Sequence, residues 1–175
     1  MIYAVDQLLD GTQSDAEWAQ WEATMKPASI FVTVPGIRTA QRFKGLASPP
    51  PYLALYSIDS LDVMSSDAYK NMGGGTYTPV KWKSAIKIWE RNVFDGIDLA
   101  PIVPMGSYLL VIDEKDPRIE AALPGLVWLR SVGLNRSIPD RAMIVVDQNG
   151  AQRWIDHPTP QVKVFAPLAP ALLSA

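Results

Sequence analysis

The sequence predicts an α+β protein in which an antiparallel sheet carries helices on one face. Two segments, Ile37–Lys44 and Tyr52–Ile58, have the side-chain alternation with a period of two that strands require. A Val34-Pro35-Gly36 turn precedes the first segment, and a Pro49-Pro50-Pro51 corner joins the two through a long hairpin loop. Together with their neighbours, they form the middle of a strand–helix–strand–strand–helix–strand unit.

The chain opens with a strand and a helix. Met1–Leu9 is short and apolar, which favours a strand. Ser14 then fits the N-cap of a helix and Glu17 its third position, the spacing of a capping box. Pro27 should end or kink this helix near its own position, and a helical segment resumes over residues 28–33.

A second helix and a fourth strand complete the unit. Ser60–Met72 predicts a helix with Ser60 as its cap, and a run of glycines follows it at positions 73–75. No Gly-Lys-Ser/Thr follows these glycines, so they form a plain loop or a mobile lid and not a phosphate loop. Ala85–Asp95 then alternates as a strand.

The second half of the chain predicts the same types of element with fewer helical residues. Residues 97–106, which contain two prolines, indicate a linker. Asn149-Gly150 is a strong signal for a hairpin turn, and the segment from Pro167 onward is typical of a tail that packs on a partner. The expected elements are strands at Tyr108–Ile112, Val127–Leu134, Ala142–Asp147 and Gln161–Ala166, with one helix at Arg118–Leu123.

The two halves form a weak internal repeat. Pro35-Gly36 to Asp59 spans nearly the same length as Pro124-Gly125 to Asp147, and the order of predicted elements recurs. The second helix is nearly missing from the second copy. We therefore expect two units, residues 1–100 and 107–175, with the second shortened.

Composition excludes several classes of function. Hydrophobic residues make up 48% of the 175 residues and charged residues 19%, which indicates a globular domain and not a disordered chain. A net charge of −2 gives no indication of a nucleic-acid partner, and the lack of cysteine excludes disulfides and thiolate ligands. No run approaches the ~18 apolar residues of a membrane helix, and the N-terminus has no basic region of a signal peptide, so we expect a cytoplasmic location.

Four stretches carry a resemblance to a known superfamily: VPGIRTAQRF, PPPYLALYSIDS, SSDAY before the glycine run, and WKSAIKIWERNVF. They resemble the dimeric α+β barrel superfamily and are most similar to its branch related to the ethyl tert-butyl ether degradation (EthD) protein. The resemblance implies a ferredoxin-like antiparallel sheet that pairs with a second such sheet, with a pocket between sheet and helices. Members of this superfamily include cofactor-free monooxygenases, polyketide cyclases, lactone isomerases, haem enzymes and proteins without assigned activity, so the fold leaves function open.

The tandem pseudo-repeat and this resemblance together predict a dimeric α+β barrel-like arrangement. Two sheet units in one chain would allow the barrel to close within that chain. A homodimer remains possible.

Two arginines on one strand face could bind a substrate carboxylate or stabilise an enolate. The alternative for Arg38 and Arg42 is a salt bridge to Glu90 or Asp6 on neighbouring strands. The alternative is favoured for Arg38, whereas the resemblance places Arg42 in the Arg-Phe motif. Arg42 is therefore a catalytic candidate.

Aromatic residues supply the other candidates for the pocket. Tyr56 is a possible catalytic donor or base, and a partly satisfied core tyrosine is the alternative. The residues proposed to bind the substrate are Trp21, Tyr69, Trp82, Trp89 and Asn92. For the helix tryptophan, packing between helix and sheet is the alternative to lining the pocket.

His157 is the only histidine, and it lies in an Asp156-His157-Pro158 sequence. It is the only side chain whose ordinary pKa suits acid–base work near neutrality, and a surface turn is its alternative role. A haem protein would need His157 as the proximal ligand. A metal site would have only carboxylates as further ligands, so we expect neither metal nor cofactor.

These observations favour a small cofactor-independent enzyme that acts on a hydrophobic aromatic or polyketide-like molecule. Proton abstraction and enolate stabilisation would lead to isomerisation, cyclisation, dehydration or oxygenation. His157 or a tyrosine would be the base and Arg42 the oxyanion partner, which requires His157 to face the same cavity as Arg42. The alternative is a non-catalytic binding or stress-related protein of the same fold.

Overall fold

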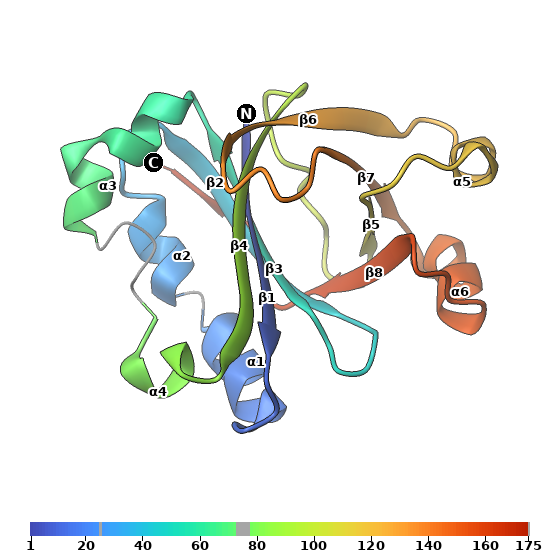
Figure 1. The fold of residues 1–175 in the computed structure, drawn as a ribbon, viewed down its shortest axis with the longest axis horizontal. Coiled ribbons are helices and arrows are strands. Elements are labelled where there is room, and N and C mark those ends of the chain that lie inside the picture. The colour runs from blue at the N-terminus through green and yellow to red at the C-terminus, as the bar shows by residue number, and fades with distance from the viewer. Residues whose placement is uncertain (25, 73–77, 175) are drawn as a thin grey trace.

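The protein forms an eight-stranded antiparallel barrel with helices on its outside, described by a computed structural model for residues 1–24, 26–72 and 78–174. The strands follow the order β3-β1-β4-β6-β7-β5-β8-β2, and β2 pairs back with β3 to close the ring (Figure 1). The barrel strands are β1 (Ile2–Leu9), β2 (Ile37–Gly45), β3 (Tyr52–Ile58), β4 (Ile86–Asp95), β5 (Tyr108–Ile112), β6 (Val127–Leu134), β7 (Asp140–Val146) and β8 (Val162–Pro167). The barrel therefore closes within one chain.

The sheet expected from the first half of the sequence is confirmed. Strand β1 lies between β3 and β4, and β2 pairs antiparallel with β3. Arg42 lies opposite Ala54, and Ala40 lies opposite Tyr56, so the arginine and tyrosine faces predicted from alternation coincide. Side chains of this face point out of the barrel, and the alternate set points into it.

Two groups of helices cover opposite sides of the barrel (Figure 1). On the side of the first half lie α1 (Asp15–Ala23), α2 (Lys26–Phe31), the 3-10 helix η1 (Leu61–Ser65), α3 (Asp67–Asn71) and α4 (Val80–Lys83). On the other side lie α5 (Pro117–Ala122) and α6 (Gln148–Asp156). Among the described residues, no helix has the length and apolar character needed to cross a bilayer.

The predicted start of α1 is confirmed, and only one half of the capping box forms. The Ser14 hydroxyl accepts a hydrogen bond from the Glu17 amide at 3.3 Å. The Glu17 carboxylate instead accepts a hydrogen bond from Lys81 Nζ at 2.7 Å, which ties α1 to α4. Pro27 occupies the second position of α2, where a missing amide hydrogen has no consequence. The expected break near Pro27 is confirmed, because α1 ends at Ala23 and α2 begins at Lys26.

Several elements differ from the sequence prediction. The single helix expected over Ser60–Met72 is divided, because Ser66 has an extended backbone and starts α3 as its N-cap. The short α4 falls in a region predicted as loop. The predicted glycine lid at 73–75 lies outside the described residues. The C-terminal tail pairs with β2 of its own chain through β9 (Leu172–Leu173).

The second half contains a helix where the sequence indicated a turn. Asn149-Gly150 lies in the first turn of α6 and not in a hairpin. The Asp147 carboxylate accepts a hydrogen bond from the Gly150 amide at 2.7 Å, which is an N-cap interaction. The same residue types favour helix starts and turns, and here packing of Ala151 and Trp154 on the sheet selects the helix.

The barrel interior is filled by side chains and by the segment between the two halves. Large apolar residues such as Phe43, Phe94 and Phe165 form its core. Residues 97–106 form no strand or helix, as the linker prediction states, but Ala100 and Val103 are buried in this core. Gln41 holds the segment by donating to the Val103 carbonyl at 2.7 Å and accepting from its amide at 2.9 Å. This segment therefore contributes to the packing of the barrel interior.

Candidate functional site

A buried arginine lies at the centre of the helix-covered face of the first half. Arg42 is 5% exposed, and its Nη1 forms an ion pair with Oε2 of Glu22 on α1. Its Nη2 donates a hydrogen bond to the Tyr56 hydroxyl at 3.1 Å. Strand β2 places Arg42 on the outer face by alternation, and α1 places Glu22 above it. The salt bridges to Glu90 or Asp6 that the sequence suggested are therefore wrong for Arg42.

The other predicted arginine serves a peripheral contact. Arg38 pairs with Asp59 at 3.0 Å and donates to the Asp98 carbonyl at 2.5 Å. Its side chain is 38% exposed, so the ion pair is a surface one. The expected structural role of Arg38 is confirmed, with partners other than Asp6 and Glu90.

Tyrosines and a phenylalanine surround the hydroxyl that Arg42 contacts. The rings of Tyr3 and Tyr56 stack with centres 5.3 Å apart, and Phe31 lies 5.3 Å from Tyr56. Tyr69 of α3 donates from its hydroxyl to that of Tyr3 at 3.3 Å. All four side chains are at most 5% exposed. The hydroxyls thus form a polar group inside an aromatic layer between the sheet and helices α2 and α3.

Three predicted tryptophans extend this layer. The Arg42 guanidinium lies 6.0 Å from the centre of the Trp21 ring, within the range of a cation–π contact. Trp18 lies 5.0 Å from Trp21 and 5.2 Å from Trp82, and Trp89 packs against the tyrosine group. The structure therefore brings Arg42 and Tyr56 to the same face as the predicted substrate-binding residues Trp21, Tyr69, Trp82 and Trp89.

Two predicted site residues lie elsewhere. Asn92 is fully buried on the inner face of the barrel, where its Nδ2 donates to the Ser137 hydroxyl at 3.1 Å. Asn92 and Trp89 are three positions apart on one strand, and an odd spacing puts side chains on opposite faces. Asn92 therefore cannot share a pocket with Trp89.

His157 is separated from the arginine site by the barrel. It caps the C-terminal end of α6, and its side chain is exposed. Helix α6 lies on the side of the second half, away from α1 (Figure 1). The expectation that His157 faces the same cavity as Arg42 is therefore not met. An exposed turn position also gives no enclosed site for a haem bound through His157.

Burial and charge pairing together determine the protonation states of Arg42, Tyr56 and Tyr3. Burial by itself lowers the pKa of Arg42, but Glu22 and Tyr56 raise it by more, so the guanidinium stays charged. Burial raises the pKa of Tyr56 more than Arg42 lowers it. Burial, followed by Tyr69, raises the pKa of Tyr3 well above its ordinary value. Near neutral pH both tyrosines are protonated, so they act as hydrogen-bond donors and not as bases.

Glu22 and Tyr3 were not predicted from the sequence as site residues. Glu22 is 2% exposed and its Oε1 has no hydrogen-bond partner among the described residues. Its spacing of four from Trp18 puts both on the same face of α1, and this signal could have identified it. Tyr3 gave no signal beyond its place in an apolar strand.

Unpaired polar atoms gather on this face of the sheet. Besides Glu22 Oε1, the buried side-chain atoms without a hydrogen-bond partner among the described residues include Gln7 Oε1, Trp18 Nε1 and Arg42 Nε on this face. Others belong to Arg38, Ser131, Trp154 and Thr159. Buried polar atoms are nearly always paired, so such a group is a feature of functional sites. The face combines one acceptor on a carboxylate with donors on a cation and an indole. In the same described residues, no group of three or more His, Asp or Glu side chains could hold a metal ion.

The fold and this site define a class of protein: a closed antiparallel α+β barrel with a charged, aromatic layer under the helices of one half. No protein-family model matches the sequence, and no curated protein matches it. Solved structures share the fold. An anthrone oxidase-like protein aligns with a TM-score of 0.61 and 11% identity, over 99% of this chain and 93% of that one.

Two proteins described as candidate monooxygenases also align. The one from Fusobacterium nucleatum has a TM-score of 0.53 and 11% identity, over 95% of this chain and 92% of that one. The one from Lactobacillus acidophilus has a TM-score of 0.50 and 10% identity, over 98% of each chain. At 10–11% identity the likeness to these structures shows a common fold.

Proposed function

We propose that this protein is a small enzyme of the dimeric α+β barrel superfamily that acts on a hydrophobic aromatic molecule without a cofactor. The observation that carries the proposal is the buried Arg42, held by Glu22 and Tyr56 within an aromatic layer. The names of the structural neighbours, one anthrone oxidase-like and two monooxygenase-like, are consistent with the proposal of a small enzyme. The EthD-related branch remains our proposal on the sequence motifs alone.

The proposed chemistry is proton abstraction followed by stabilisation of an enolate. The Glu22 carboxylate, through its unpaired Oε1, takes a proton from a carbon that is next to a carbonyl or conjugated with it through an aromatic ring, as in anthrone. The negative charge that develops on the carbonyl oxygen is stabilised by Arg42 and by the protonated Tyr56. This replaces His157 as the base, because His157 lies on the other side of the barrel.

Oxygenation of such a carbanion by O₂ needs no further reductant. An anthrone, the molecule named in the description of one neighbour, has a CH₂ group made acidic by an aromatic ketone. Its anion can reduce O₂, so that one oxygen atom becomes the new carbonyl and the other leaves as water: CH₂ + O₂ gives C=O + H₂O. Isomerisation, cyclisation and dehydration begin from the same type of anion.

We also propose that the barrel consists of two ferredoxin-like units, residues 1–100 and 107–175. In support, the strands follow the order β4-β1-β3-β2 in the first unit and β8-β5-β7-β6 in the second, which is the same order by position. Helix α6 fills the place that the sequence left nearly empty in the second unit. A homodimer and a cytoplasmic location also stay proposals, and closure of the barrel within one chain means that a dimer is not required for it.

The test uses anthrone as the probe, with quinone formation followed by absorbance and O₂ uptake measured in parallel. We expect wild type to exceed the spontaneous rate, with one O₂ consumed per quinone. Glu22→Gln should lower the rate by about 10²-fold or more, the usual contribution of a general base. Tyr56→Phe should lower it less, because Arg42 remains.

His157→Ala is the control, because it removes the other candidate base and should leave the rate unchanged. Loss of activity in His157→Ala with full activity in Glu22→Gln would overturn the assignment of the base. Circular dichroism checks that each variant is folded. If anthrone raises the melting temperature of wild type without turnover, the protein is a binding module of the same fold.

A further inference from the structure

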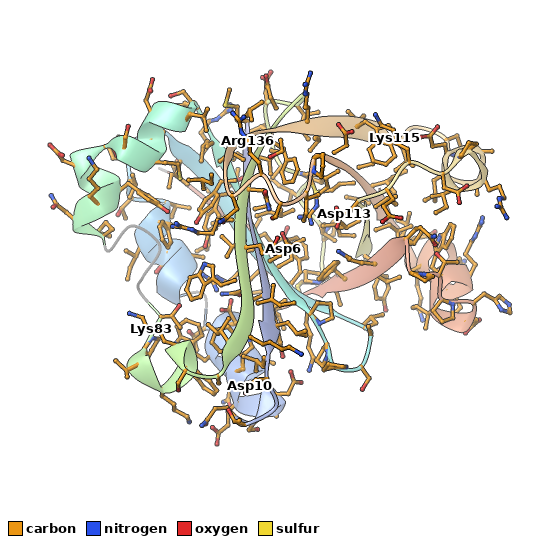
Figure 2. The ribbon with its side chains drawn as sticks, viewed as in Figure 1. Asp6, Asp10, Lys83, Asp113, Lys115 and Arg136 are labelled. Atoms are coloured by element: carbon orange, nitrogen blue, oxygen red, sulfur yellow. The ribbon has the colours of Figure 1, made fainter. Side chains whose placement is uncertain are left out.

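A cavity lies among β1, β4, β8 and the residue after β5. It has a volume of about 350 Å³, within the range of small-molecule sites. Strands β1, β4 and β8 and the residue after β5 contribute charged side chains to it: Asp6, Glu90, Lys163 and Asp113. Figure 2 labels Asp6 and Asp113 inside the ring of strands. Gln7 and Tyr52 also line this cavity, whereas Arg42 lies on the outer face of the barrel and does not line it.

Two of its carboxylates are neutralised by a buried network. Arg141 of β7 is fully buried and donates two hydrogen bonds to Asp6, both at 3.0 Å. It donates two more to Asp113, at 2.7 and 3.1 Å, and Lys163 Nζ donates to Asp113 at 2.7 Å. Two carboxylates and two cations thus balance, and the network adds no net charge to the cavity.

Glu90 is left over. It is directly opposite Asp6 in the pairing of β1 with β4, on the inner face. Like charges at such a position repel each other, because the Cβ atoms of directly opposite residues lie only about 4.5–5.5 Å apart. Asp6 is compensated by Arg141, but the Glu90 side chain has no hydrogen bond or ion pair with any described residue. The cavity therefore carries one uncompensated negative charge next to a second carboxylate.

The rest of the wall is apolar and includes exposed hydrophobic surface. Leu8 lies opposite Ile88 in the same strand pair, and Ile88 is 39% exposed although its side chain belongs to the inward-facing set. Pro51, Ile138 and Phe165 complete the apolar lining. A ligand that covers these side chains would remove apolar surface from water.

We propose that this cavity binds an organic cation, an ammonium or guanidinium group carried on an apolar body. The cation pairs with Glu90 and relieves its repulsion with Asp6, while the apolar body packs on Ile88, Ile138 and Phe165. A metal ion fits less well, because no group of three metal-ligating side chains exists among the described residues. The site is independent of the Arg42 face and of the reaction proposed there.

The experiment compares two probes of similar shape and opposite charge, phenethylamine and 3-phenylpropionate, by isothermal titration calorimetry. We expect wild type to bind the amine and not the carboxylate. Glu90→Gln keeps the shape of the side chain and removes its charge, so it should weaken amine binding by at least about 10-fold. Equal amine affinity in wild type and Glu90→Gln, or tighter binding of the carboxylate, would overturn the proposal.

Glu114→Gln is the matched control. Glu114 is an exposed carboxylate that lines the neighbouring cavity and not this one, so its loss should leave amine binding unchanged. Thermal unfolding without ligand gives a second measurement. Glu90→Gln should melt higher than wild type because it removes the repulsion with Asp6, and a lower melting temperature would contradict the like-charge argument. Glu22→Gln should bind the amine as wild type does, which separates this test from that of the proposed enzyme.

Discussion

Removing Arg141 should strongly destabilise the protein. Its side chain is 0% exposed, and its four hydrogen bonds neutralise Asp6 and Asp113, whose side chains are only 17% and 16% exposed. Arg141→Ala leaves these two carboxylates facing each other with Lys163 as the only cation. Breaking a buried ion pair in this way costs about 3–5 kcal/mol, a large part of a typical free energy of unfolding of about 5–15 kcal/mol.

The assay is urea unfolding followed by circular dichroism, with thermal unfolding as a second measurement. For a chain of this size the loss corresponds to a fall in melting temperature of about 6–20 °C. Adding Asp6→Asn to Arg141→Ala should recover part of the loss, because one uncompensated carboxylate is removed. The matched control is Lys115→Ala, which breaks a surface pair with Asp140 and should cost less than about 1 kcal/mol.

Equal stabilities of Arg141→Ala and Lys115→Ala would refute this reasoning. Such a result would mean that the network is open to water and that each carboxylate is solvated independently. If the double variant is no more stable than Arg141→Ala, the claim that Asp6 and Asp113 repel each other is refuted.

Three further predictions concern stability. Burial by itself raises the pKa of Asp113, but Arg141 and Lys163 lower this pKa by more. The ionised carboxylate therefore stabilises the folded state above the unfolded pKa of about 4, and this stabilisation is lost as the pH falls through the lower folded pKa. Urea midpoints measured from pH 7 to 2 should show this loss, and Asp113→Asn should flatten the pH dependence. Gly36→Ala should lower the free energy of unfolding in urea by more than about 1 kcal/mol, the cost of a strained backbone. The reason is that φ of Gly36 is +87° and an added Cβ would lie 2.6 Å from Val63 Cγ2. An unchanged free energy of unfolding would show that the turn can relax. Gln41→Leu should cost about 2–5 kcal/mol, because it leaves the amide and carbonyl of Val103 without partners, and increased hydrogen exchange at residues 97–106 would confirm where the loss occurs.

Local signals in the sequence predicted the strands and their faces well. Alternation identified the strand face that carries Arg42 and the one that carries Tyr56, and the Ser14 cap located the start of α1. These features depend on neighbours within a few residues, so the sequence contains them directly. Asn149-Gly150 shows the limit of such signals, because the same pair is compatible with a turn and with a helix start.

The candidate sites depend on contacts that no local pattern encodes. Glu22 meets Arg42 across 20 positions, and Arg141 meets Asp6 across 135. The tertiary fold also places His157 on the far side of the barrel and Asn92 on its inner face.

The sequence by itself determined which segments are strands, which side chains share a face of the first-half strands, and that one half resembles a known α+β unit. Only the tertiary structure decided which charges meet and which are left uncompensated. Hydrophobic alternation is a property of adjacent residues, whereas ion pairing depends on how the closed barrel and its helices bring distant side chains together out of water.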